Sequence, residues 1–245
     1  MIKFFRNLRK KQLDEGKTTK YARYAIGEIV LVVIGILIAL QVNNWNENRK
    51  NLAIRKNYSM SLISDFEKDS LDLSNLIIQL KKDSITFASI QKRIETSTAN
   101  PDTIAQIFRY DFPVLVRIDY SFNNTTLVNL VGNNSVSYPT EIRKSMAELV
   151  KNQNDFINAN SAMIDKYFDI LNKKSSYPFE NYFFKGDKSA RDAVWATNKP
   201  ITLIADFEQL ADFKFAYTRL ILVFAQAMQT YTHNLKTELQ KLEKL

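Results

Sequence analysis

Apolar residues are distributed unevenly along this 245-residue chain, and one run of them stands apart. Residues 29–40 contain no polar side chain, and only Glu28 and Gln41 interrupt an apolar segment that reaches from Ala25 to Val42. At about 1.5 Å of rise per residue, a helix over this segment spans roughly 27 Å, close to the ~30 Å hydrocarbon core of a bilayer. The pattern predicts a single transmembrane helix over residues 21–46.

Aromatic and amide residues flank the apolar run on both sides. Tyr21 and Tyr24 precede it, and Trp45 follows it within a group of asparagines. Such residues are typical of the interface between bilayer and water. A buried helix of a soluble protein is the alternative interpretation, and the flanking residues favour the membrane-spanning one.

Beyond the apolar run, Gly and Pro are so rare that three stretches contain neither: 36–100, 140–177 and 201–245. We expect a long helix in each, the first one continuing the membrane helix outward. Apolar residues at spacings of three and four predict the buried face of each helix. These residues are Leu62, Phe66, Leu73, Leu76, Leu80, Phe87, Ile90 and Ile94 in the first stretch, Ile142, Met146, Leu149, Phe156, Ile164, Phe168 and Leu171 in the second, and Leu210, Phe213, Tyr217, Leu220, Phe224, Met228, Tyr231 and Leu235 in the third.

Shorter helices are expected between the long ones, each with a start or stop signal. Asp102 and Asn124 are predicted N-caps, and Gly132 is predicted to end the second short helix in a left-handed conformation. Pro139 is expected in the first turn of the next long helix, and Ser189–Asp192 resembles a capping box. The predicted fold is therefore all-α, with a single transmembrane helix that continues into an exported antiparallel helical bundle.

Charge is also distributed unevenly, and this predicts the topology. Eight Lys and Arg residues stand against two acids in residues 1–23, whereas only four cations follow soon after the span. The positive-inside rule then places the N-terminus in the cytoplasm and the bulk of the chain outside it. We expect a basic cytoplasmic amphipathic arm at 1–20, the transmembrane helix at 21–46 and an exported helical-bundle domain at 47–245. The arm either lies on anionic lipid or is solvated and serves only to fix the topology.

Composition argues against most catalytic chemistry. The chain has no Cys, five Gly and one His, His233, so that thiolate sites, His-based triads and glycine-rich phosphate loops have no residues to build them. The acidic residues Asp65, Glu67 and Asp69 are interpreted as part of a solvated helix face. We therefore predict no catalytic, cofactor-binding or metal-binding residue, no cofactor and no enzymatic activity. The domain beyond the span is nearly neutral, and no nucleic-acid partner is expected.

Two surfaces are candidates for interaction. On the membrane helix, one narrow stripe combines a glutamate with small residues, which lets helix backbones approach closely. This predicted contact face consists of Glu28, Val32, Gly35 and Ala39. An aromatic cluster after the second long helix is predicted either to bind a partner or apolar ligand or to form a lid on the end of the bundle. Its members are Tyr177, Phe179, Tyr182, Phe183, Phe184 and Trp195.

The segment YAIGEIVLVVIGILIALQVNNWNE at 24–47, together with the start MIKFFRNLRK, resembles an uncharacterised family of small single-pass envelope membrane proteins of Gram-negative bacteria. Residues 125–143 are similar in layout to the short helix, glycine turn and following helix of that family. The resemblance implies a protein of the cell inner membrane with a helical periplasmic domain. It brings no known activity and no site residues.

These observations together favour a membrane-anchored, non-enzymatic protein that senses, scaffolds or interacts within the envelope. The alternative is an accessory subunit of a membrane transport or secretion complex that acts through its transmembrane helix. The expected partners are the lipid bilayer and either a second copy of the chain or another envelope protein.

Overall fold

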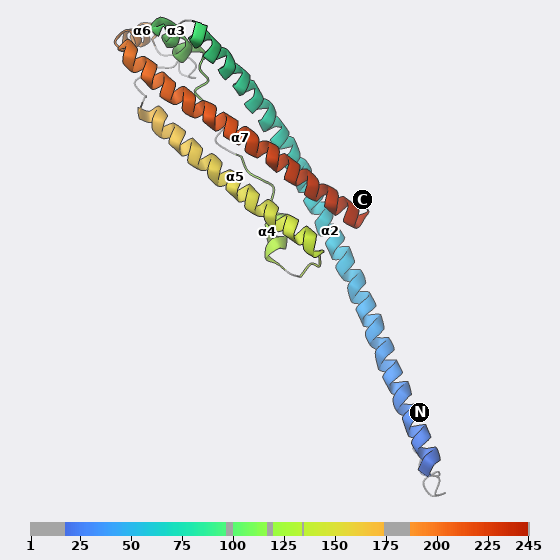
Figure 1. The fold of residues 1–245 in the computed structure, drawn as a ribbon. Helices are drawn as coiled ribbons and strands as arrows, with labels where there is room; N and C mark the ends of the chain where they lie inside the picture. Colours follow the sequence, from blue (N-terminus) through green and yellow to red (C-terminus); the bar gives the residue numbers. More distant parts are fainter. Residues whose placement is uncertain (1–17, 97–99, 117–119, 134, 174–186, 245) are drawn as a thin grey trace. The chain divides into compact units, whose positions relative to one another are not determined.

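The computed structural model describes residues 18–96, 100–116, 120–133, 135–173 and 187–244 (Figure 1). These residues contain helices and no strand, which confirms the predicted all-α class for the part of the chain described. The helices are α2 (Thr18–Thr96), α3 (Pro101–Gln106), the π-helix η1 (Ile107–Asp111), α4 (Thr125–Gly132), α5 (Thr140–Lys173), α6 (Lys188–Ala196) and α7 (Pro200–Glu243).

The chain divides into two compact units, Met1–Arg55 and Lys56–Leu245. In the first unit, every residue of α2 from Ile26 to Trp45 is exposed. By length and composition, α2 is the one helix of the described residues that is apolar enough to cross a membrane. The helix continues without interruption to Thr96, as expected for a stretch that lacks Gly and Pro.

The core of the second unit consists of three clusters of buried apolar side chains, and each cluster combines residues of α2, α5 and α7. Burying one large aliphatic or aromatic side chain contributes about 1.5–3 kcal/mol, so these clusters are the main source of the unit's stability. The first cluster includes Phe87, Phe108, Tyr167 and Phe207, the second includes Leu62, Leu127, Met146 and Leu235, and the third includes Leu73, Phe122, Phe156 and Ile221.

The predicted core positions of α2 and α5 are confirmed, since all of them are buried or half-buried. In α7 two predictions are wrong: Leu220 is 38% exposed and Tyr231 is 42% exposed. The buried face of α7 instead runs through three polar residues, Lys214, Thr218 and Thr232. A prediction based on apolar residues alone therefore selects some positions of α7 that lie outside its buried face.

The ends of α3 and α4 differ from the prediction in three places. Asn100, not Asp102, caps α3, and its side chain accepts a hydrogen bond from the Asp102 backbone N–H. Gly132 belongs to α4 without a left-handed φ, and the chain leaves this helix through Asn133 in an extended conformation. Asn124 is the N-cap residue of α4, but its side chain makes no capping hydrogen bond.

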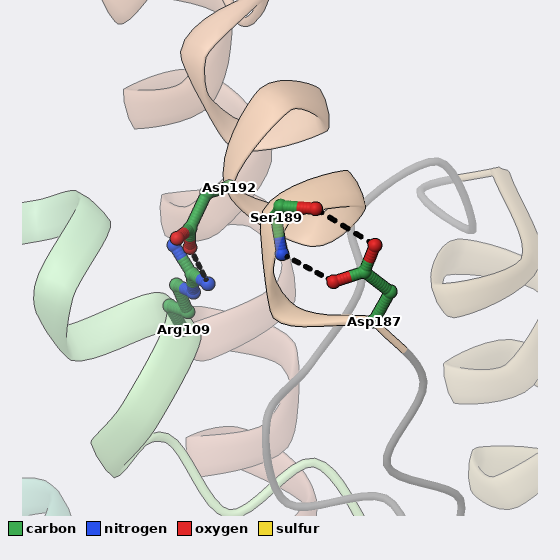
Figure 2. Close-up of polar contacts among 4 residues, drawn as sticks. All are labelled: Arg109, Asp187, Ser189 and Asp192. Atoms are coloured by element: carbon green, nitrogen blue, oxygen red, sulfur yellow. Dashed lines mark hydrogen bonds and ion pairs between the residues drawn. The ribbon is translucent and has the colours of Figure 1, made fainter.

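The start of α6 is fixed by Asp187, one residue before the helix (Figure 2). Its carboxylate accepts hydrogen bonds from the backbone N–H of Ser189 at 3.0 Å and from the Ser189 hydroxyl at 2.7 Å. These bonds from Ser189 lower the pKa of Asp187. The cap is thus the aspartate that precedes the predicted box at Ser189–Asp192. Pro139 likewise lies one residue ahead of α5, and its carbonyl accepts from the Arg143 N–H at 3.0 Å.

Candidate functional site

Residues 112–116 and 120–124, between η1 and α4, have no regular secondary structure. Buried side chains of the long helices hold this irregular stretch in place. The Lys214 ammonium donates to the carbonyl of Leu115 at 2.6 Å, and the Tyr167 hydroxyl donates to the carbonyl of Val114 at 2.5 Å. A buried backbone carbonyl without a partner is costly, so a polar residue on the inner face of a helix is favourable here.

Lys214 lies among aromatic rings. Its Nζ is 5.6 Å from the ring centroid of Phe112, 5.8 Å from that of Tyr167 and 6.0 Å from that of Phe87. Ring faces attract a cation, but they replace only part of its hydration. Burial therefore lowers the pKa of Lys214 to about 8, and the charge of Asp83 offsets only part of this effect.

This lowered pKa predicts how stability depends on pH. Between pH 8 and 10 the amine is neutral in the folded protein but charged in the unfolded chain, so the unfolded chain binds more protons. The free energy of unfolding should therefore rise by about 2–3 kcal/mol across this range. Urea denaturation of the full chain in detergent micelles, followed by circular dichroism at several pH values, measures the rise.

The matched control is Lys214→Met, which keeps the length of the side chain and removes the titrating group. The rise should be absent in this variant, and equal slopes in both proteins would show that Lys214 is not its source. The range ends at pH 10 because burial raises the pKa of Tyr120. Above about pH 10 this tyrosine ionises in the unfolded chain but stays protonated in the folded protein. The free energy of unfolding then falls as the pH rises, which would oppose the effect of Lys214.

Asp69 holds the other end of the irregular stretch. It is buried, and its Oδ1 accepts hydrogen bonds from the backbone N–H and the side-chain amide of Asn123, both at 2.8 Å. Its Oδ2 has no hydrogen-bond partner among the described residues. Burial raises the pKa of Asp69, although the two bonds from Asn123 lower it. The interpretation of Asp69 as part of a solvated face is therefore wrong, because donors from a distant segment compensate for its burial.

Next to this stretch lies an open pocket of about 570 Å³. Its volume is within the ~300–1,000 Å³ range of small-molecule sites. Four parts of the chain line it: Asp72, Asn75, Leu76 and Gln79 from α2, Tyr120 and Ser121 from the irregular stretch, Phe156 and Asn160 from α5, and Tyr217 and Ile221 from α7.

The pocket combines aromatic rings with carboxylate, amide and hydroxyl groups. Phe156, Asn160 and Tyr217 are buried, and the Tyr217 hydroxyl donates to Asn160 Oδ1 at 3.1 Å. Tyr120 packs on Phe156 with ring centroids 5.4 Å apart. The lining thus combines aromatic rings of α5 and α7 with polar groups of α2, and this combination suits the binding of a small polar molecule. Among the described residues, no group of three His, Asp or Glu side chains is placed to hold a metal ion.

Sequence reasoning missed this pocket, although signals for it were present. Asp72, Asn75 and Gln79 are spaced by three and four residues and so share one face of α2. Asn160 takes the place of an apolar residue between Phe156 and Ile164 in the inner face of α5. Such a polar interruption of an apolar series indicates either a buried hydrogen bond or a site.

The predicted contact face of the membrane helix is exposed throughout, at Glu28, Val32, Gly35 and Ala39. A Cβ atom at Gly35 would meet no heavy atom within 4 Å. The chain itself therefore leaves room at Gly35 for a larger side chain. The four residues stay a predicted contact face.

The predicted aromatic surface lies mostly outside the described residues. Trp195, on α6, is described, and its ring packs edge-on against Phe108 with centroids 5.8 Å apart. The Arg109 guanidinium lies 5.7 Å from the Trp195 ring centroid and forms an ion pair with Asp192 (Figure 2). Trp195 thus packs against the first core cluster. The residues outside the described part are Tyr177, Phe179, Tyr182, Phe183 and Phe184.

Comparison with known proteins gives a family but no activity. No curated protein and no solved structure matches the chain. A family model matches residues 28–178, which is more than half of the sequence and includes the apolar part of α2 together with α3, α4 and α5. The chain therefore belongs to DUF6090, a family of unknown function.

Proposed function

We propose that this protein is a membrane-anchored, non-enzymatic sensing or interaction protein of the Gram-negative cell envelope. In this proposal, α2 spans the inner membrane near its start, residues 1–20 lie in the cytoplasm, and residues 47–245 form a periplasmic domain. The observation that carries the proposal is the exposed apolar run of α2, from Ile26 to Trp45.

The energetics of this run favour a lipid environment. Its Leu, Ile and Val side chains are all exposed in the isolated chain. Removing one such side chain from water is favourable by about 1.5–3 kcal/mol, and a bilayer does so for all of them at once. The excess of cations before the span favours the proposed orientation.

The pairing of α5 with α7 supports an antiparallel bundle within the proposed domain. Ile142, near the start of α5, shares a buried cluster with Leu239, near the end of α7. Tyr167, near the end of α5, shares another cluster with Leu203, near the start of α7. This pattern is expected when two helices run in opposite directions.

Reporter fusions test the orientation. A reporter fused after Leu245 should behave as exported, and one fused before Met1 should behave as cytoplasmic, because the cations preceding the span are retained on the inner side. Alkaline phosphatase, which is active only when exported, and a fluorescent protein that matures in the cytoplasm provide the two signals. The reverse pattern would overturn the proposed periplasmic domain.

A second candidate function is that of an accessory subunit in a membrane transport or secretion complex. It is favoured by the predicted contact face of Glu28, Val32, Gly35 and Ala39, which is exposed throughout on the membrane helix. The two functions differ in where the partner attaches. A sensing or interaction protein is contacted on residues 47–245, whereas an accessory subunit of this kind is contacted along the membrane helix.

A further inference from the structure

The pocket is lined by residues of α2, α5 and α7 and by Tyr120 and Ser121. Among the described residues that line it, Asp72 is the one with a charged side chain. Within the described part of the chain, the Asp72 carboxylate makes no hydrogen bond and no ion pair. Asp69 lies beside the pocket, since the Tyr120 hydroxyl is 3.5 Å from the Asp69 carbonyl oxygen. Burial and then the charges of Asp69 and Asp72 raise the pKa of Tyr120. An anionic ligand would meet repulsion from these carboxylates and no cation among the described residues of the lining.

The face of α2 in the pocket presents hydrogen-bond acceptors. Gln79 Nε2 donates to Asp83 Oδ1 at 3.1 Å, which leaves Gln79 Oε1 as an acceptor. Asp72 and Asn75 add their side-chain oxygens on the same helix face. A primary ammonium group has three N–H donors and no acceptor, so it can bond to the side-chain oxygens of Asp72 and Asn75, which lie about one helical turn apart, with water as a third partner. Bonds from a charged donor to a carboxylate are about twice as strong as those between neutral groups.

The aromatic residues of the lining suit a cation as well. They are Phe156, Tyr217 and Tyr120, and the first two are buried in the third core cluster. The faces of aromatic rings attract ammonium groups. Leu76 and Ile221 provide apolar surface beside these rings, where a hydrocarbon chain can pack.

We propose that this pocket binds a small aliphatic amine, with its ammonium group against Asp72 and the Asn75 amide oxygen and its hydrocarbon chain against Leu76 and Ile221. The proposal deepens the proposed sensing function and rests on it, because it names the ligand class of the exported domain. A neutral polyol is the rival ligand. It would use Ser121 and Asn160 but would supply no positive charge to Asp72.

Three probes of equal length separate these chemistries: 1,4-diaminobutane, 1,4-butanediol and succinate. Each is titrated by calorimetry into the full-length protein in detergent micelles at low salt. The diamine should bind, and the diol and the dicarboxylate should not. Asp72→Asn should weaken diamine binding by about two- to fivefold, the range expected for an exposed ion pair, since it removes the charge while keeping the shape.

The matched control is Asp165→Asn, which removes an exposed carboxylate of α5 that does not line the pocket. It should leave diamine binding unchanged, which separates a local contact from the effect of net charge. Asp72 is itself exposed, so both variants are expected to fold, and circular dichroism verifies this.

Three results would overturn the amine proposal: no diamine binding to the folded protein, equal binding of diol and diamine, or equal loss in both variants. Binding of succinate would overturn it as well, because the pocket would then accept an anion. None of these results affects the reporter-fusion test. A failed amine titration with the proposed orientation intact would reject only the ligand class, whereas a reversed orientation would reject the proposed function itself.

Discussion

Leu73→Asp is expected to lower the free energy of unfolding of the Lys56–Leu245 unit by several kcal/mol. Leu73 is 0% exposed and belongs to the third core cluster. The variant loses the apolar contacts of the leucine and places an unpaired carboxylate in the core, and each of these changes is costly. Urea denaturation of the full chain in micelles, followed by circular dichroism, measures the difference.

The same helix provides a matched control. Leu71→Asp makes the same chemical change two residues earlier, where the side chain is 63% exposed. Its effect should stay within about 0.5 kcal/mol, as for most surface substitutions. Similar denaturation midpoints for the two variants would show that the third cluster does not form around Leu73.

Gly35→Ile is expected to abolish self-association of the membrane helix. Small residues at an interface let two helix backbones approach closely, and a branched side chain at this position would keep them apart. Because nothing lies within 4 Å of the Cβ position at Gly35, the substitution does not disturb the chain's own packing. Any loss of association would therefore report a contact between helices.

A membrane two-hybrid assay on residues 18–50 measures this association. Ile34→Leu, which changes the neighbouring residue but leaves the predicted face intact, should associate like the parent. If Gly35→Ile associates equally well, the stripe of Glu28, Val32, Gly35 and Ala39 is not a contact face. The accessory-subunit function would then lose its main support.

Helix positions and most of the core follow from local sequence information. Proline marks the start of two long helices, since Pro139 lies just before α5 and Pro200 opens α7, whereas α2 runs through Gly27 and Gly35. The spacing of apolar residues identified the inner faces of α2 and α5, because each of these faces is mainly apolar. Both kinds of information lie within a single helix and need no knowledge of its neighbours.

The buried polar residues could not be predicted in this way. Lys214 lies on the inner face of α7 because its ammonium reaches the carbonyl of Leu115, 99 residues earlier in the chain. Asp69 is buried because Asn123, 54 residues later, supplies two donors. Both hydrogen-bonding arrangements depend on where the irregular stretch between η1 and α4 contacts the long helices. The spacing of apolar residues within one helix carries no information about such distant contacts. The pocket was missed for the same reason, since four separate parts of the chain build it.

The second core cluster also has a consequence for synthesis of the protein. Leu62 and Phe66 of α2 are covered partly by Leu235 and Leu239 of α7, and the Ser59 hydroxyl donates to the Glu243 carboxylate 184 residues away. This cluster therefore cannot close until nearly the whole of α7 has left the ribosome, long after the apolar run of α2. Throughout that interval the apolar inner face of α2 is exposed, and it can associate with other unfolded or partly folded chains. A growing chain of this protein thus depends on prompt completion, or on a chaperone that shields this face.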